Sequence, residues 1–258
     1  MNREIGKENE FDERIHTLVI EGRNAVLEAF RSGKPIDKVF VLDGCQDGPI
    51  RTIVREAKKH DTILNFVSKE RLNQLSQTGK HQGAIAYAAA YEYAEVEDML
   101  ALAKERGEDP FILLLDNIED PHNLGAIIRT ANLAGAHGVI IPKRRAVGLT
   151  ATVAKTSAGA LNYTPVAKVT NLAKTMEELK EKGLWFVCAD MGGESMYRLN
   201  LKGPIGLVIG NEGEGVSRLV KEKCDFIASI PMKGDIDSLN ASVAAGVLAY
   251  EIVRQRLH

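Results

Sequence analysis

The segment FILLLDNIEDPHNLGAIIRT (residues 111–130) joins an apolar run to a helical pattern through a short polar loop. The run Phe111–Leu115 contains no polar residue, which is typical of a strand that is buried on both faces of a parallel sheet. The pattern Leu124–Leu133 then predicts a helix that packs on this sheet. A strand, a loop and a helix in this order predict an α/β fold, in which ligands bind beyond the carboxyl ends of the strands.

The same alternation continues to the end of the chain. Apolar runs predict strands at 111–116, 138–142, 164–169, 184–190, 205–210 and 226–231, and helical patterns occupy 124–133, 171–183, 216–223 and 239–256. We therefore predict a mostly parallel, doubly wound sheet with helices on both faces.

A second, smaller α/β pattern precedes this region. Helices are expected at 22–33, 50–60 and 69–79, and strands at 38–43, 62–67 and 84–90. An acidic segment separates the two patterns and is expected to connect two domains, with a helical turn or two around Val96–Lys104. The predicted organisation is a disordered lead-in at 1–14, a small domain at 15–90, a linker at 91–109 and a large domain at 110–258.

The composition is that of an ordinary globular protein, with 258 residues, 45% hydrophobic and 26% charged. The charged first residues lack the apolar core of a signal peptide, and no apolar run is long enough for a membrane helix, so a cytoplasmic protein is expected. The cysteines Cys45, Cys188 and Cys224 lack metal-ligand spacing, which predicts buried thiols and no metal site. The net charge of −2 argues against a protein that coats nucleic acid, so a polyanion would bind to local basic patches.

The loop 116–125 carries polar side chains into the helix after it. Asn123 can cap this helix, and Arg129 and Asn132 are polar where such a helix usually packs on its sheet. A surface position for Arg129 remains an alternative.

The glycine-rich turn Gly210–Gly215 directly follows a predicted strand. Its spacing, G-x-x-G-x-G, differs from the dinucleotide pattern, which disfavours a nicotinamide enzyme. Glu212 within the turn would repel a phosphate, so a ligand with positive charge or amide donors fits better.

The loop Ile230–Ser242 leads into the last helix. Asp237 or Ser238 can cap that helix, and Asn240 and Ser242 are then expected in its first turn. The Ala- and Gly-rich side of the helix indicates either a core helix or a subunit interface.

Two groups of basic residues are candidate RNA contacts. Lys143, Arg144 and Arg145 follow a predicted strand at the ligand-bearing edge of the sheet. Arg51, Arg55, Lys58 and Lys59 share one side of the helix 50–60. For both groups a solvated surface is an equal alternative.

Three segments together resemble the TrmH-type RNA ribose 2′-O-methyltransferases of the SPOUT superfamily. They are N-x-G-x-x-x-R-T at 123–130, I-G-N-E-G-x-G at 209–215 and I-P-M…S-L-N-A-S at 230–242, in the order and spacing of the family. The upstream segment VIEGRNAVLEAF is similar to the substrate-binding domain of the same family, which is L30e-like. Within the family the likeness is greatest to bacterial enzymes that methylate a guanosine of large-subunit ribosomal RNA.

The resemblance implies a C-terminal trefoil knot, a homodimer, and S-adenosylmethionine as methyl donor. By likeness, the reaction site would contain Asn123, Arg129, Glu212, Ser238 and Asn240. The cofactor would lie against Gly210, Asn211, Gly213, Ile230 and Leu239. Candidate RNA contacts are Arg23, Lys143, Arg144 and Arg145. A transfer-RNA methyltransferase and a non-catalytic RNA-binding relative remain the alternatives.

The implied reaction is attack of a ribose hydroxyl on the methyl group of a sulfonium ion. Arg129 is an unsuitable general base, because a guanidinium stays protonated in proteins. We therefore expect Arg129 to position the target and to stabilise the developing oxyanion. Glu212 could accept the proton or could brace its loop.

Overall fold

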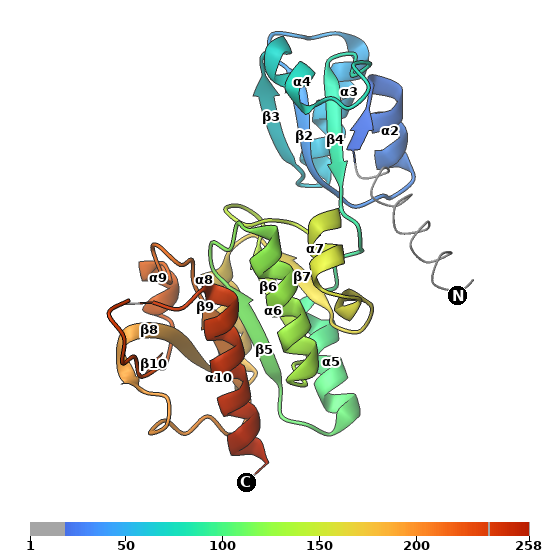
Figure 1. Cartoon of the computed structure of the whole chain (residues 1–258). Helices are drawn as coiled ribbons and strands as arrows, with labels where there is room; N and C mark the ends of the chain where they lie inside the picture. The colour runs from blue at the N-terminus through green and yellow to red at the C-terminus, as the bar shows by residue number, and fades with distance from the viewer. Residues whose placement is uncertain (1–18, 237, 258) are drawn as a thin grey trace, which may run out of the picture. The chain divides into compact units, whose positions relative to one another are not determined.

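The computed structural model describes residues 19–236 and 238–257. The chain divides into two compact units (Figure 1). The first takes in the described residues up to Glu92 and also Gly148–Ala151, and the second contains Tyr93–Val147 and the residues from Thr152 onward. The expected lead-in at 1–14 lies outside the described residues, as does Asp237.

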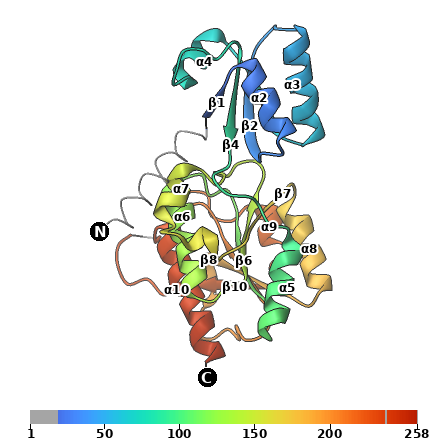
Figure 2. The same cartoon turned by 90° about the vertical axis from the view of Figure 1, so that its right-hand side faces the viewer.

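The first unit is built on a four-stranded mixed sheet. Its strand order is β1-β4-β2-β3, with β3 parallel to β2 and β4 antiparallel to both β1 and β2. Figure 2 shows α2 and α3 on one side of this sheet and α4 on the other. The elements are β1 (Val19–Glu21), α2 (Arg23–Arg31), β2 (Ile36–Leu42), α3 (Gly48–Lys59), β3 (Ile63–Val67), α4 (Lys69–Leu75) and β4 (Ala84–Ala88).

The second unit contains a six-stranded sheet in which every neighbouring pair is parallel, which confirms the predicted fold class. Its helices are α5 (Val96–Arg106), α6 (Pro121–Leu133), α7 (Ala151–Thr156), α8 (Leu172–Glu181), α9 (Arg218–Lys221) and α10 (Ala241–Arg256), with a 3-10 turn at Ala160–Asn162. Its strands are β5 (Phe111–Leu115), β6 (Gly138–Pro142), β7 (Val166–Val169), β8 (Trp185–Ser195), β9 (Ile205–Ile209) and β10 (Phe226–Ser229).

The strand order is β10-β8-β9-β5-β6-β7. From β5 the chain adds β6 and β7 toward one edge of the sheet, and it then returns to β5 and builds the other half. The point between β5 and β9, where the order of strand addition reverses, is the reversal point of the sheet. Both central strands are buried along their whole length, as their uninterrupted apolar sequences predicted. In such sheets the crevice at the reversal point is the usual ligand site.

Helices cover both faces of the second sheet: α5 and α8 lie on one side and α6 and α10 on the other (Figure 2). The helix α5 comes from the segment that the sequence marked as a linker. Its side chain Met99 is fully buried in the core that also holds Ile112 and Met176. The acidic segment therefore contributes a helix to the second unit, because its few apolar residues recur on one face.

No helix among the described residues has the length and apolar character needed to cross a membrane. The cysteines are all free thiols, with Cys188 buried and Cys45 and Cys224 partly exposed. In the described part of the chain, no group of acidic, histidine or cysteine side chains could hold a metal ion.

A buried histidine joins the start of β5 to the loop before β6. His137 Nδ1 accepts a hydrogen bond from the backbone N–H of Phe111 at 3.0 Å, and Nε2 lies 3.1 Å from Glu108 Oε2. Because Nδ1 is an acceptor, the ring is neutral and carries its proton on Nε2. Burial lowers the pKa of His137 below its ordinary value of 6.5, although Glu108 opposes this shift.

We predict that His137 makes the protein less stable as the pH falls below about 6.5. The folded pKa is lowered, so the unfolded chain binds the proton more readily, and protonation of Nδ1 would break the bond to Phe111. The loss is at most about 1.4 kcal/mol per pH unit for one proton. His137→Asn keeps an acceptor and removes the titration, so urea unfolding at pH 7.5 and 5.5 should show a smaller loss in the variant. Equal losses in the two proteins would contradict this account.

Candidate active site

A cleft opens at the carboxyl ends of β9 and β10, next to the reversal point of the sheet. Three segments form its walls, namely the middle of β8, the turn after β9 and the loop that leads into α10. Seven of the ten residues predicted for catalysis or cofactor binding line it: Gly210, Asn211, Glu212, Gly213, Ile230, Ser238 and Leu239.

The turn after β9 closes so tightly that its first residue must be glycine. The backbones of Asn211 and Gly215 pair in both directions, with N···O distances of 3.2 and 2.8 Å. A Cβ atom on Gly210 would lie 2.2 Å from the carbonyl carbon of Gly215. Asn211 Oδ1 accepts from the backbone N–H of Gly213 at 2.8 Å. The turn is therefore a preformed backbone cradle.

Two residues after β5 hold this turn in place. The buried carboxylate of Asp116 accepts from the backbone N–H of Ser217 at 2.7 Å. The carbonyl of Asn117 accepts from Asn211 Nδ2 at 3.3 Å. The loops at the ends of the adjacent strands β5 and β9 are thus linked by hydrogen bonds across the reversal point.

Glu212 brings together polar residues from two helices. Its Oε1 atom accepts a short hydrogen bond from Asn123 Nδ2, a bond of 3.1 Å from Asn240 Nδ2 and one of 3.4 Å from the backbone N–H of Ala241. Asn240 Nδ2 also donates to Asn123 Oδ1 at 2.9 Å. These contacts join Asn123 and Asn240 to the wall of the cleft, although neither lines it. We call Asn123, Glu212 and Asn240 the amide–carboxylate cluster.

The expected capping roles in this region were wrong in two places. Asp120, not Asn123, is the N-cap of α6, since its carboxylate accepts from the backbone N–H of His122. Asn240, not Ser238, caps α10, which begins at Ala241, and its Oδ1 accepts from the backbone N–H of Ser242 at 3.0 Å. In each case the side chain nearest to the true helix start satisfies the free N–H groups.

The lining of the cleft is acidic. Three carboxylates contribute to it, Asp190, Glu212 and Glu214, whereas no lysine or arginine of the described chain does. The Lys221 ammonium donates to Asp190 Oδ2 at 2.7 Å and holds the pKa of that carboxyl below its usual range. This lining suits a cationic ligand and disfavours a phosphate, as the position of Glu212 predicted.

Arg129 lies apart from the cleft. It is an exposed residue of α6 and does not line the cleft. Within the described ranges it makes no hydrogen bond or ion pair with the amide–carboxylate cluster. One chain therefore brings together nine of the ten predicted site residues and leaves Arg129 outside.

The basic candidates fall in two places. Lys143, Arg144 and Arg145 follow β6 at the same edge of the sheet as the cleft, and the two arginines are exposed. Arg23 belongs to the first unit, where it begins α2.

Sequence reasoning missed the wall that β8 contributes. The strand was expected to end at Asp190 but continues to Ser195, and Ala189, Asp190 and Met191 line the cleft. The pair Gly192-Gly193 lies within the unpredicted part of the strand. A Cβ atom on Gly193 would lie 2.3 Å from the carbonyl oxygen of Ile227, so this glycine permits close pairing with β10. Asp116 could have been identified by its place at the end of a buried strand.

Family models match both units. Residues 110–250 match the model of the SpoU rRNA Methylase family, and residues 19–94 match the model for RNA 2′-O ribose methyltransferase substrate binding.

Curated relatives are similar along nearly the whole chain. A protein of Bacillus subtilis named as a TrmH family tRNA/rRNA methyltransferase is 51% identical over 243 residues, which are 93% of this chain and 96% of that protein. A Staphylococcus saprophyticus protein of the same family name is 49% identical over 94% of this chain and 97% of its own length.

Solved structures agree with these matches. The SpoU methyltransferase AviRb of Streptomyces viridochromogenes, in complex with the cofactor AdoMet, has a TM-score of 0.59 and 25% identity, covering 93% of this chain and 90% of that chain. A TrmH/SpoU tRNA modifying enzyme of A. aeolicus has a TM-score of 0.53 and 30% identity, covering 58% of this chain and 77% of that chain.

We predict that Gly210→Ala weakens binding of S-adenosylmethionine by about 10- to 100-fold, which corresponds to an overpacking cost of about 1–3 kcal/mol. The added methyl group would collide with backbone that the turn cannot move without breaking its Asn211–Gly215 pairing. Isothermal titration calorimetry measures the effect. Gly234→Ala is the control, because a Cβ atom there meets nothing within 4 Å. Unchanged affinity in Gly210→Ala would contradict the cradle.

Proposed function

We propose, for a chain that belongs to the SpoU rRNA methylase family, that its reaction is methylation of a ribose 2′-hydroxyl. The protein is an S-adenosylmethionine-dependent RNA methyltransferase, as its relatives and structural neighbours are. The proposed substrate is a guanosine of large-subunit ribosomal RNA, acted on in the cytoplasm.

The observation that carries this proposal is the convergence of the amide–carboxylate cluster on the glycine cradle. The cradle offers backbone groups in a tight turn that only a glycine at position 210 permits, and the acidic lining favours the cationic sulfonium of the cofactor. The methyl group is the electrophile that the cofactor supplies when bound. Gly210, Ile230 and Leu239 would hold the adenosine, and the carboxylates would face the positive charge.

The contribution of the protein to the reaction is alignment. A hydroxyl that attacks a methyl group must approach in line with the departing sulfur, and fixed alignment can supply about 7–11 kcal/mol in favourable cases. Glu212 is already occupied by three hydrogen bonds to one oxygen, which supports a bracing role for it. Loss of Glu212 would leave the amide nitrogen of the buried Asn123 without its acceptor, at a cost of about 1–3 kcal/mol.

Arg129 completes the site from a second copy of the chain in this proposal. It is exposed and lies outside the cleft of its own chain. The neighbouring helix α10 exposes Val243 and Tyr250, and its C-cap residue Leu257 is also exposed; the three recur every seven residues and so form one apolar stripe. Such a stripe is suited to a two-fold interface. The trefoil knot implied by the resemblance stays a prediction.

The choice of ribosomal over transfer RNA rests on the first unit. That unit matches the family model for substrate binding, so we expect it to give the protein an RNA-binding surface in addition to the catalytic region. Relatives carry names that include both tRNA and rRNA, so transfer RNA is the alternative that the assay below separates.

We predict that the purified protein transfers labelled methyl groups from S-adenosylmethionine to unmodified ribosomal RNA, at a single guanosine 2′-hydroxyl found by mapping. Arg129→Ala should lower turnover by about 10²–10³-fold, the usual effect of removing one oxyanion donor. Arg129→Lys should recover little, because lysine provides only a point charge. Label in transfer RNA alone would overturn the target, and absence of any transfer would contradict the proposed activity.

A complementation assay tests the shared site. Gly210→Ala and Arg129→Ala chains are co-expressed with different tags, purified as mixed dimers, and assayed at a cofactor concentration at which each variant alone has little activity. If Arg129 acts across the interface, one of the two sites in the mixed dimer is complete, and about half of the wild-type turnover should return. Absence of any recovery would assign Arg129 to the cleft of its own chain.

A further inference from the structure

A second hollow, of about 590 Å³, lies within the first unit, and we call it the Arg23 groove. Its polar walls come from the start of α2, from α4 and from the loop before β4. Two cations, Arg23 and Lys69, line it together with Asn73, His81 and Gln82, and no carboxylate of the described residues does. The volume falls in the range of about 300–1,000 Å³ that is usual for ligand sites.

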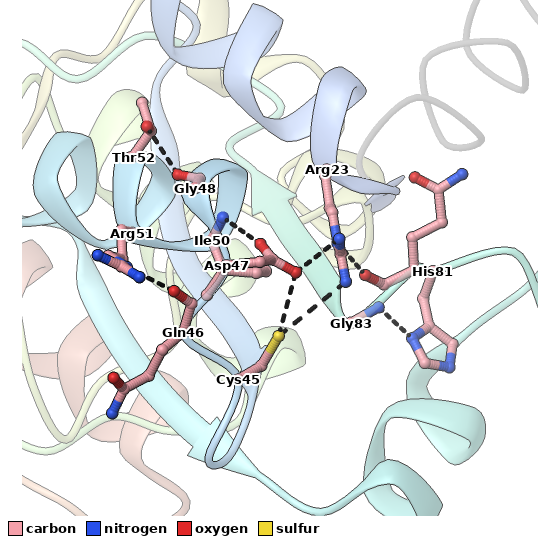
Figure 3. Close-up of polar contacts among 11 residues, drawn as sticks. Arg23, Cys45, Gln46, Asp47, Gly48, Ile50, Arg51, Thr52, His81 and Gly83 are labelled. Carbon is pink, nitrogen blue, oxygen red and sulfur yellow. Dashed lines mark hydrogen bonds and ion pairs between the residues drawn. The ribbon is translucent and has the colours of Figure 1, made fainter.

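Arg23 is held in one orientation by its neighbours (Figure 3). Its Nε donates to the carbonyl of Gln82 at 2.7 Å, and Nη1 forms an ion pair with Asp47 Oδ2 at 2.6 Å. The Nη2 atom lies 4.0 Å from the sulfur of Cys45. A guanidinium has five N–H donors, so these contacts fix the orientation of the Arg23 guanidinium and still leave N–H donors for a ligand.

His81 fixes the orientation of Asn73. The buried ring accepts at Nδ1 from the backbone N–H of Gly83 at 3.0 Å (Figure 3), so its proton is on Nε2. Nε2 lies 3.0 Å from the Asn73 side-chain oxygen and donates to it. The Asn73 amide nitrogen is then turned outward with two donors. Lys69 precedes Asn73 by four residues on α4, so both side chains share one face.

The loop 76–83 is built before any ligand arrives. Its start is held by the carboxylate of Glu21, which accepts from Thr78 Oγ1 at 2.7 Å and from the backbone N–H of Thr78 at 3.2 Å. Near its end, Gln82 adopts a left-handed backbone with φ of 51°, which is unfavourable for a residue other than glycine. This conformation accompanies the bond from Arg23 to the Gln82 carbonyl. Strain of this kind is concentrated at ligand sites.

From this geometry we infer that the Arg23 groove binds one unstacked nucleotide of the substrate RNA. Arg23 and Lys69 hold its phosphate, and the two amide donors of Asn73 face an acceptor atom on the edge of its base. The inference rests on the proposed function, because it assigns a nucleotide subsite to the unit that binds the substrate. It makes Arg23, Lys69 and Asn73 contact residues and His81 a positioning residue.

The residue types match single-stranded RNA and not a small anion. A phosphate alone would need only the cations, whereas an oriented amide adds a donor pattern that can read a base edge. Bases of loops and bulges are free to enter such a hollow, while bases inside an RNA duplex are not. The groove is therefore expected to contribute to both affinity and sequence preference.

Fluorescence anisotropy with the full chain tests the groove, with an unmodified large-subunit ribosomal RNA transcript as the probe and salt as the variable. Lys69→Gln should weaken binding and reduce the slope of log Kd against log salt by about 0.7–0.9, the change for one phosphate contact.

Asn73→Leu should weaken binding by about 5- to 100-fold without changing the salt slope, because it removes base contacts and no charge. Lys34→Gln is the matched control, since it removes an exposed lysine of the first unit, between α2 and β2, that does not line the groove.

Affinity for S-adenosylmethionine is measured in every variant and should stay at the wild-type value. Wild-type RNA affinity in both Lys69→Gln and Asn73→Leu would overturn the groove and leave the methyltransferase proposal intact. Equal losses in Lys34→Gln and Lys69→Gln would also overturn it, because binding would then follow bulk charge. Loss of cofactor binding in the wild type would instead contradict the proposed reaction.

Discussion

The arrangement of the candidate active site depends on one carboxylate oxygen, Glu212 Oε1. It receives donors from Asn123 on α6 and from Asn240 and Ala241 at the start of α10. Three segments that are distant in the sequence thereby meet at the turn after β9. Because a buried polar group without a partner is costly, each member of the cluster constrains the positions of the others. The cradle, the cleft and the direction of α10 all follow from this meeting point.

The two hollows carry opposite charge, and this explains how a protein with a net charge of −2 can act on RNA. The cleft is lined by three carboxylates and suits a cationic cofactor, while the Arg23 groove is lined by two cations and suits a phosphate. Bulk charge of either sign would attract one of these ligands and repel the other. Separation of the charges into local patches gives each hollow its own ligand class.

Local patterns in the sequence predicted the parallel sheet and the glycine-rich turn, while the other site residues were expected from the family resemblance. Uninterrupted apolar runs identified β5 and β9, and the glycine spacing located the cradle at Gly210. Features that depend on contacts between distant residues were not predictable in this way. The extension of β8 requires Gly193 to lie against β10, and the role of α5 depends on Met99 reaching the core. Neither contact can be inferred from the sequence of β8 or α5 alone, because each depends on a segment that is distant in the sequence.

The two capping errors both concern side chains of the amide–carboxylate cluster. Asn123 was expected to cap α6 but is released from this role because Asp120 caps that helix, and Asn240 was expected inside α10 but is its N-cap. Asn240 caps α10 with its oxygen and keeps its nitrogen for Asn123 and Glu212. An amide can serve both purposes because it combines an acceptor with two donors. An aspartate at 240 could cap the helix equally well but would repel Glu212, so asparagine at this position reflects the site and not the helix alone.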